Sequence, residues 1–238
     1  PYCQALDPTG RQRLRDLATL FLLQKRFEGA AGLVVTDEMR LWVALQACVL
    51  ILNLGLEYYA GWSAVILYPG DFRVRRRHAE ELADAPWQHE SLALVHEAED
   101  ELSGESWPQG PVILSWQAVS TSSTKQNIVL HEFAHKIDML NGDADGFPPL
   151  HAGMHAQVWT RDFEAAYQDL CDALDSGRPV RIDDYAAESP AEFFAVLSET
   201  FFIDPRLVYE DFPMIYRHLK DFYRQDPRAL LVENNSGR

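Results

Sequence analysis

The sequence predicts an α+β fold in which helices surround a small mixed sheet. Long stretches have apolar residues at helical spacing, and two short runs, residues 62–68 and 112–116, are rich in β-forming residues. Helices and strands follow one another without the regular βαβ alternation of a doubly wound sheet. The chain has 238 residues, of which 47% are hydrophobic, so a substantial core is available. We expect a single domain over residues 1–238, with a helical N-terminal part to about residue 60 and a catalytic core from about 61 to 225.

The N-terminal part is expected to hold two helices joined by a short extended segment. Residues 7–27 have apolar side chains on one helical side, and Gly29 lies just past their end. Residues 33–35 are a candidate strand. Thr36 can cap a second helix, which the pattern extends to about residue 54. Because this second helix is apolar nearly all round, we expect it to be central.

The remainder of the chain combines loops, the strand at 112–116 and further helices. Residues 78–110 are polar and contain several prolines and glycines, which indicates loops that could include one short strand. Three later stretches have helical patterns: 155–176, 190–203 and 205–223. The tail after Pro227 is polar, and we expect it to be loose.

Charge and hydropathy argue against two classes of partner. The net charge is −15 at pH 7 and the pI is about 4.8, which argues against direct binding of nucleic acid. The basic run at residues 73–77 is short and is followed by acidic residues, so a solvated surface segment is the better interpretation. The apolar stretch 41–56 is too short to span a membrane, and Gln46 and Asn53 interrupt it.

The cysteines indicate a reducing compartment. Cys3, Cys48 and Cys171 lie far apart and have neither zinc-finger nor redox spacing. Cys48 lies in an apolar run and is expected in the core. No signal peptide is visible, and we expect a cytoplasmic protein.

Residues 131–135 read His-Glu-Phe-Ala-His and carry most of the functional information. Two histidines four positions apart lie about 40° apart around a helix, so both imidazoles can bind one metal ion. Glu132 is adjacent and could take a proton from a metal-bound water. Apolar residues at helical spacing flank the motif, residues 122–124 (Ser-Ser-Thr) offer N-caps, and Gly142 offers a C-terminal stop. The pattern indicates metal-assisted hydrolysis, most often of a peptide bond.

A catalytic zinc site needs a third protein ligand from elsewhere in the chain. Glu192 is the best source, since Pro190 suits a first helical turn and apolar residues flank the carboxylate. On the residues alone, zinc ligation and simple stabilisation of Glu192 by the helix dipole are near-equal alternatives. Glu188 and Glu199 compete for the ligand role. Asp138, on the same face of the motif helix, is well placed to orient a ligand histidine.

The chain resembles a known bacterial family. The segment 131–146 closely resembles the Mlc titration factor A proteins, also called DgsA anti-repressors, which form a small family of zinc metallopeptidases. Other similar stretches extend the resemblance over nearly the whole chain: 32–39, 46–48, 52–56 and 192–199. We find no departure from the family at a position that carries chemistry.

The resemblance implies a zincin-like core of the gluzincin type, similar to the catalytic domain of anthrax lethal factor. It implies that His131, His135 and Glu192 hold one Zn²⁺ per chain, with Glu132 as the catalytic base. It also gives Tyr185 a catalytic role, in which the hydroxyl donates to the oxyanion of the tetrahedral intermediate. By analogy with zinc peptidases of this type, residues 112–116 would pair with extended substrate.

Two functions follow from the resemblance. The first is a zinc-dependent, aminopeptidase-like enzyme that hydrolyses a peptide or protein substrate and acts on the glucose phosphotransferase system by binding the glucose repressor Mlc. The alternative is a non-catalytic protein that titrates the repressor by direct contact and keeps a structural zinc. The intact Glu132 favours the enzyme, because a structural site needs no base.

Overall fold

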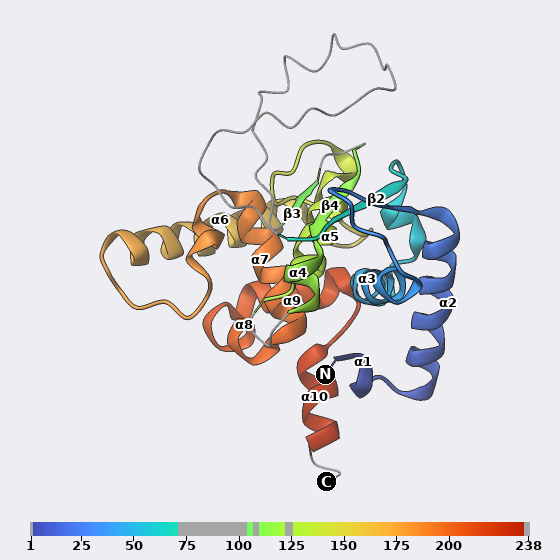
Figure 1. Ribbon diagram of the computed structural model, residues 1–238. Coiled ribbons are helices and arrows are strands. Elements are labelled where there is room, and N and C mark those ends of the chain that lie inside the picture. Colours follow the sequence, from blue (N-terminus) through green and yellow to red (C-terminus); the bar gives the residue numbers. More distant parts are fainter. Residues whose placement is uncertain (1, 71–103, 107–109, 122–125, 236–238) are drawn as a thin grey trace.

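The computed structural model describes residues 2–70, 104–106, 110–121 and 126–235. Within these ranges helices surround a small sheet, as Figure 1 shows, and the predicted mixed, helix-rich fold is confirmed. The basic run at 73–77, most of the predicted loop region 78–110 and the candidate caps at 122–124 lie outside the described residues. No described helix combines the length and the apolar character that a membrane span requires.

The sheet has four described strands in the spatial order β1-β2-β4-β3. Their bounds are Arg26–Gly29 for β1, Ala64–Tyr68 for β2, Gly104–Ser106 for β3 and Val112–Ser115 for β4. Strands β1, β2 and β4 run parallel, with Phe27 opposite Val65 and Ile66 opposite Ile113, whereas β3 runs antiparallel to β4. Strands β2 and β4 agree with the two predicted strands, and β3 is the short strand in the predicted loop region.

Strand β1 was not recognised in the sequence. The pattern assigns residues 26–27 to the preceding helix and 33–35 to a strand, but pairing with β2 falls at residues 26–29. The side chains of β1 are mostly exposed, so it lacks the apolar alternation by which a strand is recognised. By contrast, all four residues of β4 are buried. Because α3 (Asp37–Leu50) lies between β1 and β2, the parallel pair forms one βαβ connection that the sequence pattern does not indicate.

The N-terminal helices lie on one side of the molecule (Figure 1). Helix α2 spans Pro8–Gln24 and packs against α3. The predicted cap of α3 is confirmed, because the Thr36 hydroxyl accepts a hydrogen bond from a backbone N–H of the first turn. Helix α3 ends at Leu50 rather than near residue 54, and its Leu41 and Trp42 are about half exposed. It is therefore less central than its composition predicts.

Helices α5 (Ile128–Asp138) and α7 (Pro190–Ile203) form the centre of the fold and pack against each other. All residues of α5 from Val129 onward are buried, as are the ten consecutive residues 193–202 of α7. Helix α5 begins after Asn127, whose side chain accepts the Leu130 N–H, so its cap is not at residues 122–124. Helix α7 begins at Pro190 as predicted, after a Ser189 cap.

The C-terminal helices correct two predictions. Helix α6 (Ala156–Asp175) agrees with its pattern. The predicted helix 205–223 is divided into α8 (Pro205–Asp211) and α9 (Pro213–Tyr223), because the proline at 213 has no N–H with which to continue a helix. The tail forms a helix, α10 (Pro227–Asn235), which contacts α1 (Tyr2–Ala5) at the other end of the chain. This tertiary contact outweighs the polar composition from which a loose tail was predicted.

Short helices and one core complete the described fold. The short helices are α4 (Trp116–Ser120), η1 (Leu56–Tyr59), η3 (Met139–Asn141) and η4 (Asp184–Ala187). A cluster of buried apolar side chains extends from Tyr2 to Tyr223 and includes Cys48, as predicted. All three cysteines are free thiols.

Candidate metal centre

The two motif histidines are buried together on helix α5. His131 and His135 are each 7% exposed, and their ring centroids lie 4.9 Å apart in an edge-to-face arrangement. One helical turn separates the two residues, so their Nε2 atoms approach the same point. The structure therefore places these side chains as the motif predicts.

Glu192 reaches the histidines from the first turn of α7. Its Oε2 lies 3.1 Å from His131 Nε2 and 3.2 Å from His135 Nε2. The Ser189 hydroxyl accepts the Glu192 N–H and so caps the start of α7. The Glu192 carboxylate points towards α5. Of the three glutamates that the sequence offers as a third ligand, all within the described residues, Glu192 is the one grouped with both histidines.

This trio of side chains fits a metal ion. One ligand atom from each of His131, His135 and Glu192 lies within 4.8 Å of the others. A tetrahedral zinc ion with bonds of about 2.0–2.1 Å separates its ligand atoms by about 3.3 Å, close to the two nitrogen–oxygen distances found here. Two imidazole nitrogens and one carboxylate oxygen are also donors that zinc accepts. His131, His135 and Glu192 could therefore hold one ion.

The electrostatics of the cluster favour a cation. Burial alone would lower the pKa of His131, but hydrogen bonds to Glu192 and Glu199 outweigh it and raise that pKa to about 10. Burial would raise the pKa of Glu192, but its bonds to His131 and His135 hold that pKa well below its usual range. In the metal-free protein a proton on the histidine balances the buried carboxylates. A bound metal ion would take the place of that proton.

The two competing glutamates have different positions. Glu199 lies on α7 with its Oε2 3.5 Å from His131 Nδ1, the ring nitrogen that does not contact Glu192. Glu188 is exposed, directly before the cap of α7. Glu199 follows Glu192 by seven residues, which is two helical turns and the same helix face. That spacing was the signal in the sequence that could have related the two carboxylates to one site.

Glu132 lies beside the cluster with a buried lysine one turn away. Glu132 is 4% exposed and Lys136 is 2% exposed. The Lys136 ammonium donates to the Gly110 carbonyl at 2.8 Å. Burial lowers the pKa of Lys136 to about 7, although the charge of Glu132 opposes this shift. The proposed base therefore lies in a low-dielectric environment that it shares with a buried lysine of lowered pKa.

Tyr185 is exposed, unlike His131, Glu132, His135 and Glu192. It lies on η4, is 37% exposed, and its ring centroid is 6.0 Å from that of His131. The Asp183 side chain accepts the Tyr185 N–H and fixes the start of η4. The tyrosine thus lies next to the candidate metal ligand His131 and is also accessible to a molecule that approaches from solvent.

Asp138 does not make the hydrogen bond that the sequence predicts. Its Oδ2 accepts the Gly146 N–H at 2.8 Å. Its Oδ1 and the Nδ1 of His135 have no hydrogen-bond partner among the residues that the structure describes. Burial raises the pKa of Asp138 to about 7, against the opposing effect of the Gly146 bond. The loop after α5 competes for this carboxylate, which sequence spacing alone could not reveal.

Gly146 connects the C-terminal end of α5 to α6 and α7. Besides donating to Asp138, it accepts the Trp159 indole N–H at 3.2 Å. Its φ is +79°, and a Cβ at this position would lie 2.5 Å from the Pro190 carbonyl oxygen. A glycine is needed here for the backbone conformation and for the close approach of α7.

The strand predicted to bind substrate has no free edge. Strand β4 is paired with β2 on one side and with β3 on the other, so its backbone groups are already used. Of the described strands, β3 is the outer one at this end of the sheet, and it also contacts α5. The prediction for residues 112–116 is therefore wrong, because the sequence does not show that the short strand expected before it pairs with β4.

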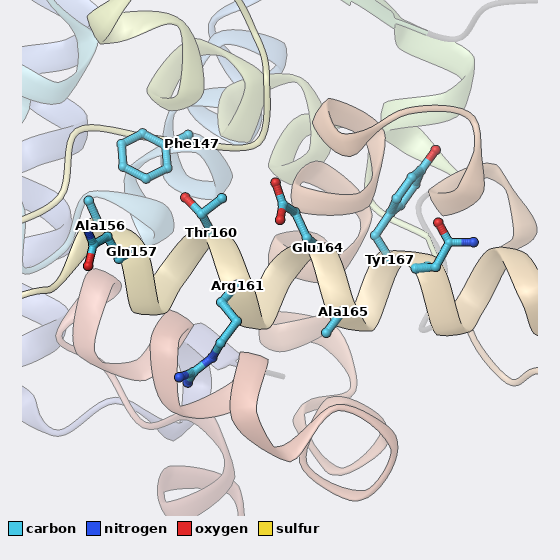
Figure 2. A pocket seen from close by; sticks show the side chains of 9 residues that line it. Phe147, Ala156, Gln157, Thr160, Arg161, Glu164, Ala165 and Tyr167 are labelled. Atoms are coloured by element: carbon cyan, nitrogen blue, oxygen red, sulfur yellow. The ribbon is translucent and has the colours of Figure 1, made fainter.

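A hollow of about 860 Å³ lies along α6, away from the three candidate metal ligands His131, His135 and Glu192. Figure 2 shows Thr160, Glu164 and Tyr167 on the side of α6 that faces Phe147, with Arg161 on another side. The Tyr167 hydroxyl donates to the Ala187 carbonyl at 2.9 Å and so ties α6 to η4. The hollow adjoins the segment that carries Tyr185, and none of the three metal-cluster residues lines it.

Two buried histidines one turn apart, a glutamate from a second helix and a glutamate between the histidines define a site of the metallopeptidase type. Comparison with known families agrees. The family model of the glucose-regulated metallo-peptidases M90 matches residues 1–224, and the chain belongs to this family.

Similar proteins are Mlc titration factors. The Mlc titration factor A of Yersinia pestis (strain Pestoides F) is 40% identical over 236 residues, which cover 97% of this chain and 83% of the relative. The Mlc titration factor A of Yersinia pseudotuberculosis (serotype O:1b, strain IP 31758) matches with the same identity and coverage. The family resemblance found in the sequence is confirmed.

Proposed function

We propose that the chain is a zinc-dependent peptidase, aminopeptidase-like in its substrates, with a zincin-like core built on α5 and α7. The observation that carries this proposal is the approach of Glu192 Oε2 to within 3.2 Å of both motif histidines. Membership of a metallopeptidase family supports a hydrolytic role. One zinc ion per chain would be held by His131, His135 and Glu192.

The residues around the cluster would divide the chemistry among them. Bound zinc would supply a Lewis acid that polarises the scissile carbonyl and acidifies water. The Glu132 carboxylate would accept a proton from the attacking water and return it to the leaving amine. The Tyr185 hydroxyl would donate a hydrogen bond to the carbonyl oxygen as negative charge develops there. An extended substrate would lie along the outer edge of β3, where backbone groups could pair with it.

The test combines metal analysis with hydrolysis of chromogenic aminoacyl substrates. We expect Glu132→Gln to retain about one zinc per chain and to lose activity by about 10²–10⁴-fold, because the base is gone and the ligands remain. Glu188→Gln is the matched control, since it changes an exposed glutamate in the segment before α7. Near wild-type turnover by Glu132→Gln would contradict the assignment of the base.

A second candidate function is binding of the repressor Mlc, favoured by the names of the Yersinia relatives. We infer that the chain binds this repressor in the cytoplasm and thereby acts on the glucose phosphotransferase system. The binding could be the sole function, with a structural zinc, or it could accompany catalysis. Binding of purified Mlc to wild type, Glu132→Gln and His135→Ala separates these cases. Binding that survives in both variants would place the partner surface away from the metal, and absence of binding by wild type would contradict this function.

A further inference from the structure

Glu199 is a buried carboxylate with two partners on the neighbouring helix. It lies on α7, two turns after Glu192, and is 7% exposed. One oxygen accepts the backbone N–H of Asn127, the cap residue of α5. The other oxygen lies 3.5 Å from His131 Nδ1. A carboxylate with so little solvent contact needs such partners, because an unpaired buried charge is costly.

The contact with His131 determines which nitrogen of that ring can face a metal ion. An imidazole that binds a metal through Nε2 carries its proton on Nδ1, and an acceptor at Nδ1 fixes both the tautomer and the ring orientation. In His131, Nε2 points to Glu192 and Nδ1 points to Glu199. The two carboxylates of α7 therefore hold opposite sides of one ring.

The contact with Asn127 fixes the helix that carries the ring. The Asn127 side chain accepts the Leu130 N–H within α5 and donates to Gln46 Oε1 on α3 at 2.6 Å. Glu199 thus meets the N-terminal end of α5, where the helix dipole favours a negative charge. Through Asn127 the carboxylate ties α7 to the first turn of α5 and, indirectly, to α3.

We propose that Glu199 is a positioning residue that fixes His131 as an Nε2 ligand of the metal ion by accepting hydrogen bonds from His131 Nδ1–H and the Asn127 N–H together. This inference rests on the metal site proposed above and extends it to a residue that does not touch the ion.

The test measures zinc affinity and the state of the His131 ring. Zinc dissociation constants are obtained by competition with a chromogenic chelator for wild type, Glu199→Gln and the control Glu188→Gln. We expect Glu199→Gln to weaken zinc binding by about 10–100-fold, because a neutral amide is a poorer acceptor and has one oxygen for two donors. Glu188→Gln should leave the affinity unchanged.

Nitrogen-edited NMR of the zinc-loaded proteins distinguishes positioning from a general structural effect. In wild type we expect a His131 Nδ1–H resonance that is far downfield and slow to exchange, and in Glu199→Gln we expect it to move upfield and to exchange faster. Weaker zinc binding with an unchanged Nδ1–H resonance would overturn the proposal, because Glu199 would then act through fold stability alone. Unchanged affinity in Glu199→Gln would overturn it as well and would leave the metal site intact.

Two results need no glutamine variant. Coordination of zinc by His131 Nδ1 in wild type would overturn the proposal on its own. Absence of zinc binding by wild type would overturn the metal site together with this inference.

If Glu199→Gln does not fold, Glu199→Asp keeps the charge and shortens its reach, and it should still weaken zinc binding and move the Nδ1–H resonance.

Discussion

The two ends of helix α5 are held in place by different means. At the N-terminal end, His131 Nδ1 lies beside the Glu199 carboxylate, which also binds the cap residue. At the C-terminal end, His135 Nδ1 has no partner among the described residues, and Asp138 accepts its hydrogen bond from the Gly146 loop. A carboxylate therefore contacts the His131 ring directly. Near His135 the carboxylate of Asp138 binds the backbone of the Gly146 loop and not the ring. The two ends should respond to different perturbations.

The largest expected effect comes from removing one histidine at a time. Both His131→Ala and His135→Ala should lose zinc, because three protein ligands are needed. In the metal-free protein, however, His131→Ala removes the histidine that faces Glu199 and leaves Glu192 with His135 alone, whereas His135→Ala leaves both carboxylates beside His131. We expect a loss of about 3 kcal/mol in the free energy of unfolding for the first and about 1 kcal/mol for the second, measured by urea denaturation at pH 7. Equal losses of unfolding free energy in the two variants would contradict the proposed difference between the two ends of α5.

A smaller effect should follow from a methyl group in the loop. Gly146→Ala combines a positive φ with a contact 2.5 Å from the Pro190 carbonyl, so the start of α7 must move. We expect it to cost about 2 kcal/mol in unfolding free energy and to weaken zinc binding, since Glu192 lies in that first turn. Gly177→Ala is the matched control, with a φ of +67° and nothing within 4 Å. It should cost about 1 kcal/mol and leave zinc binding unchanged. Equal zinc affinity in both variants would show that the loop does not position Glu192.

The smallest expected effect depends on pH. The folded pKa of Asp138 is raised from 3.8 to about 7, so the folded protein holds its proton more tightly than the unfolded chain does. The stability of wild type relative to Asp138→Asn should therefore fall as the pH rises from about 4 to about 7, and then level off. At pH 8 we expect the metal-free variant to be more stable by about 1 kcal/mol, because a buried charge has been removed and the Gly146 N–H can still be accepted. Thermal unfolding at pH 4 and pH 8 checks this, and an advantage that shrinks with rising pH would contradict it.

Local signals in the sequence predicted the central helices well. Residues 131–135 have a motif, apolar neighbours at helical spacing and a nearby stop, and all of these are properties of one short segment. Pro190 and Ser189 mark the start of α7 in the same local way. Thr36 was recognised as a cap for the same reason. Strand β1 and the tail helix were missed because each is stabilised by partners distant in sequence rather than by its own pattern.

The three candidate metal ligands show the same limit of prediction from sequence. His131 and His135 could be paired from their spacing, but the choice between Glu192 and its helix-dipole alternative stayed open on the residues alone. Which glutamate reaches the histidines depends on how α7 packs against α5, and that packing is set by the core. Asp138 was assigned to a histidine because spacing relates the two, whereas the loop that takes its hydrogen bond returns from eight residues away.

Helix α7 carries Glu192 in its first turn and Glu199 two turns later, and its ten consecutive residues 193–202 are buried. Its aromatic and aliphatic side chains therefore set both the stability of the fold and the position of the carboxylates. For protein engineering this means that the two properties cannot be adjusted separately. A substitution chosen to repack the centre of the molecule also shifts the groups around His131, so selection for a more stable core is at the same time selection on the affinity for metal.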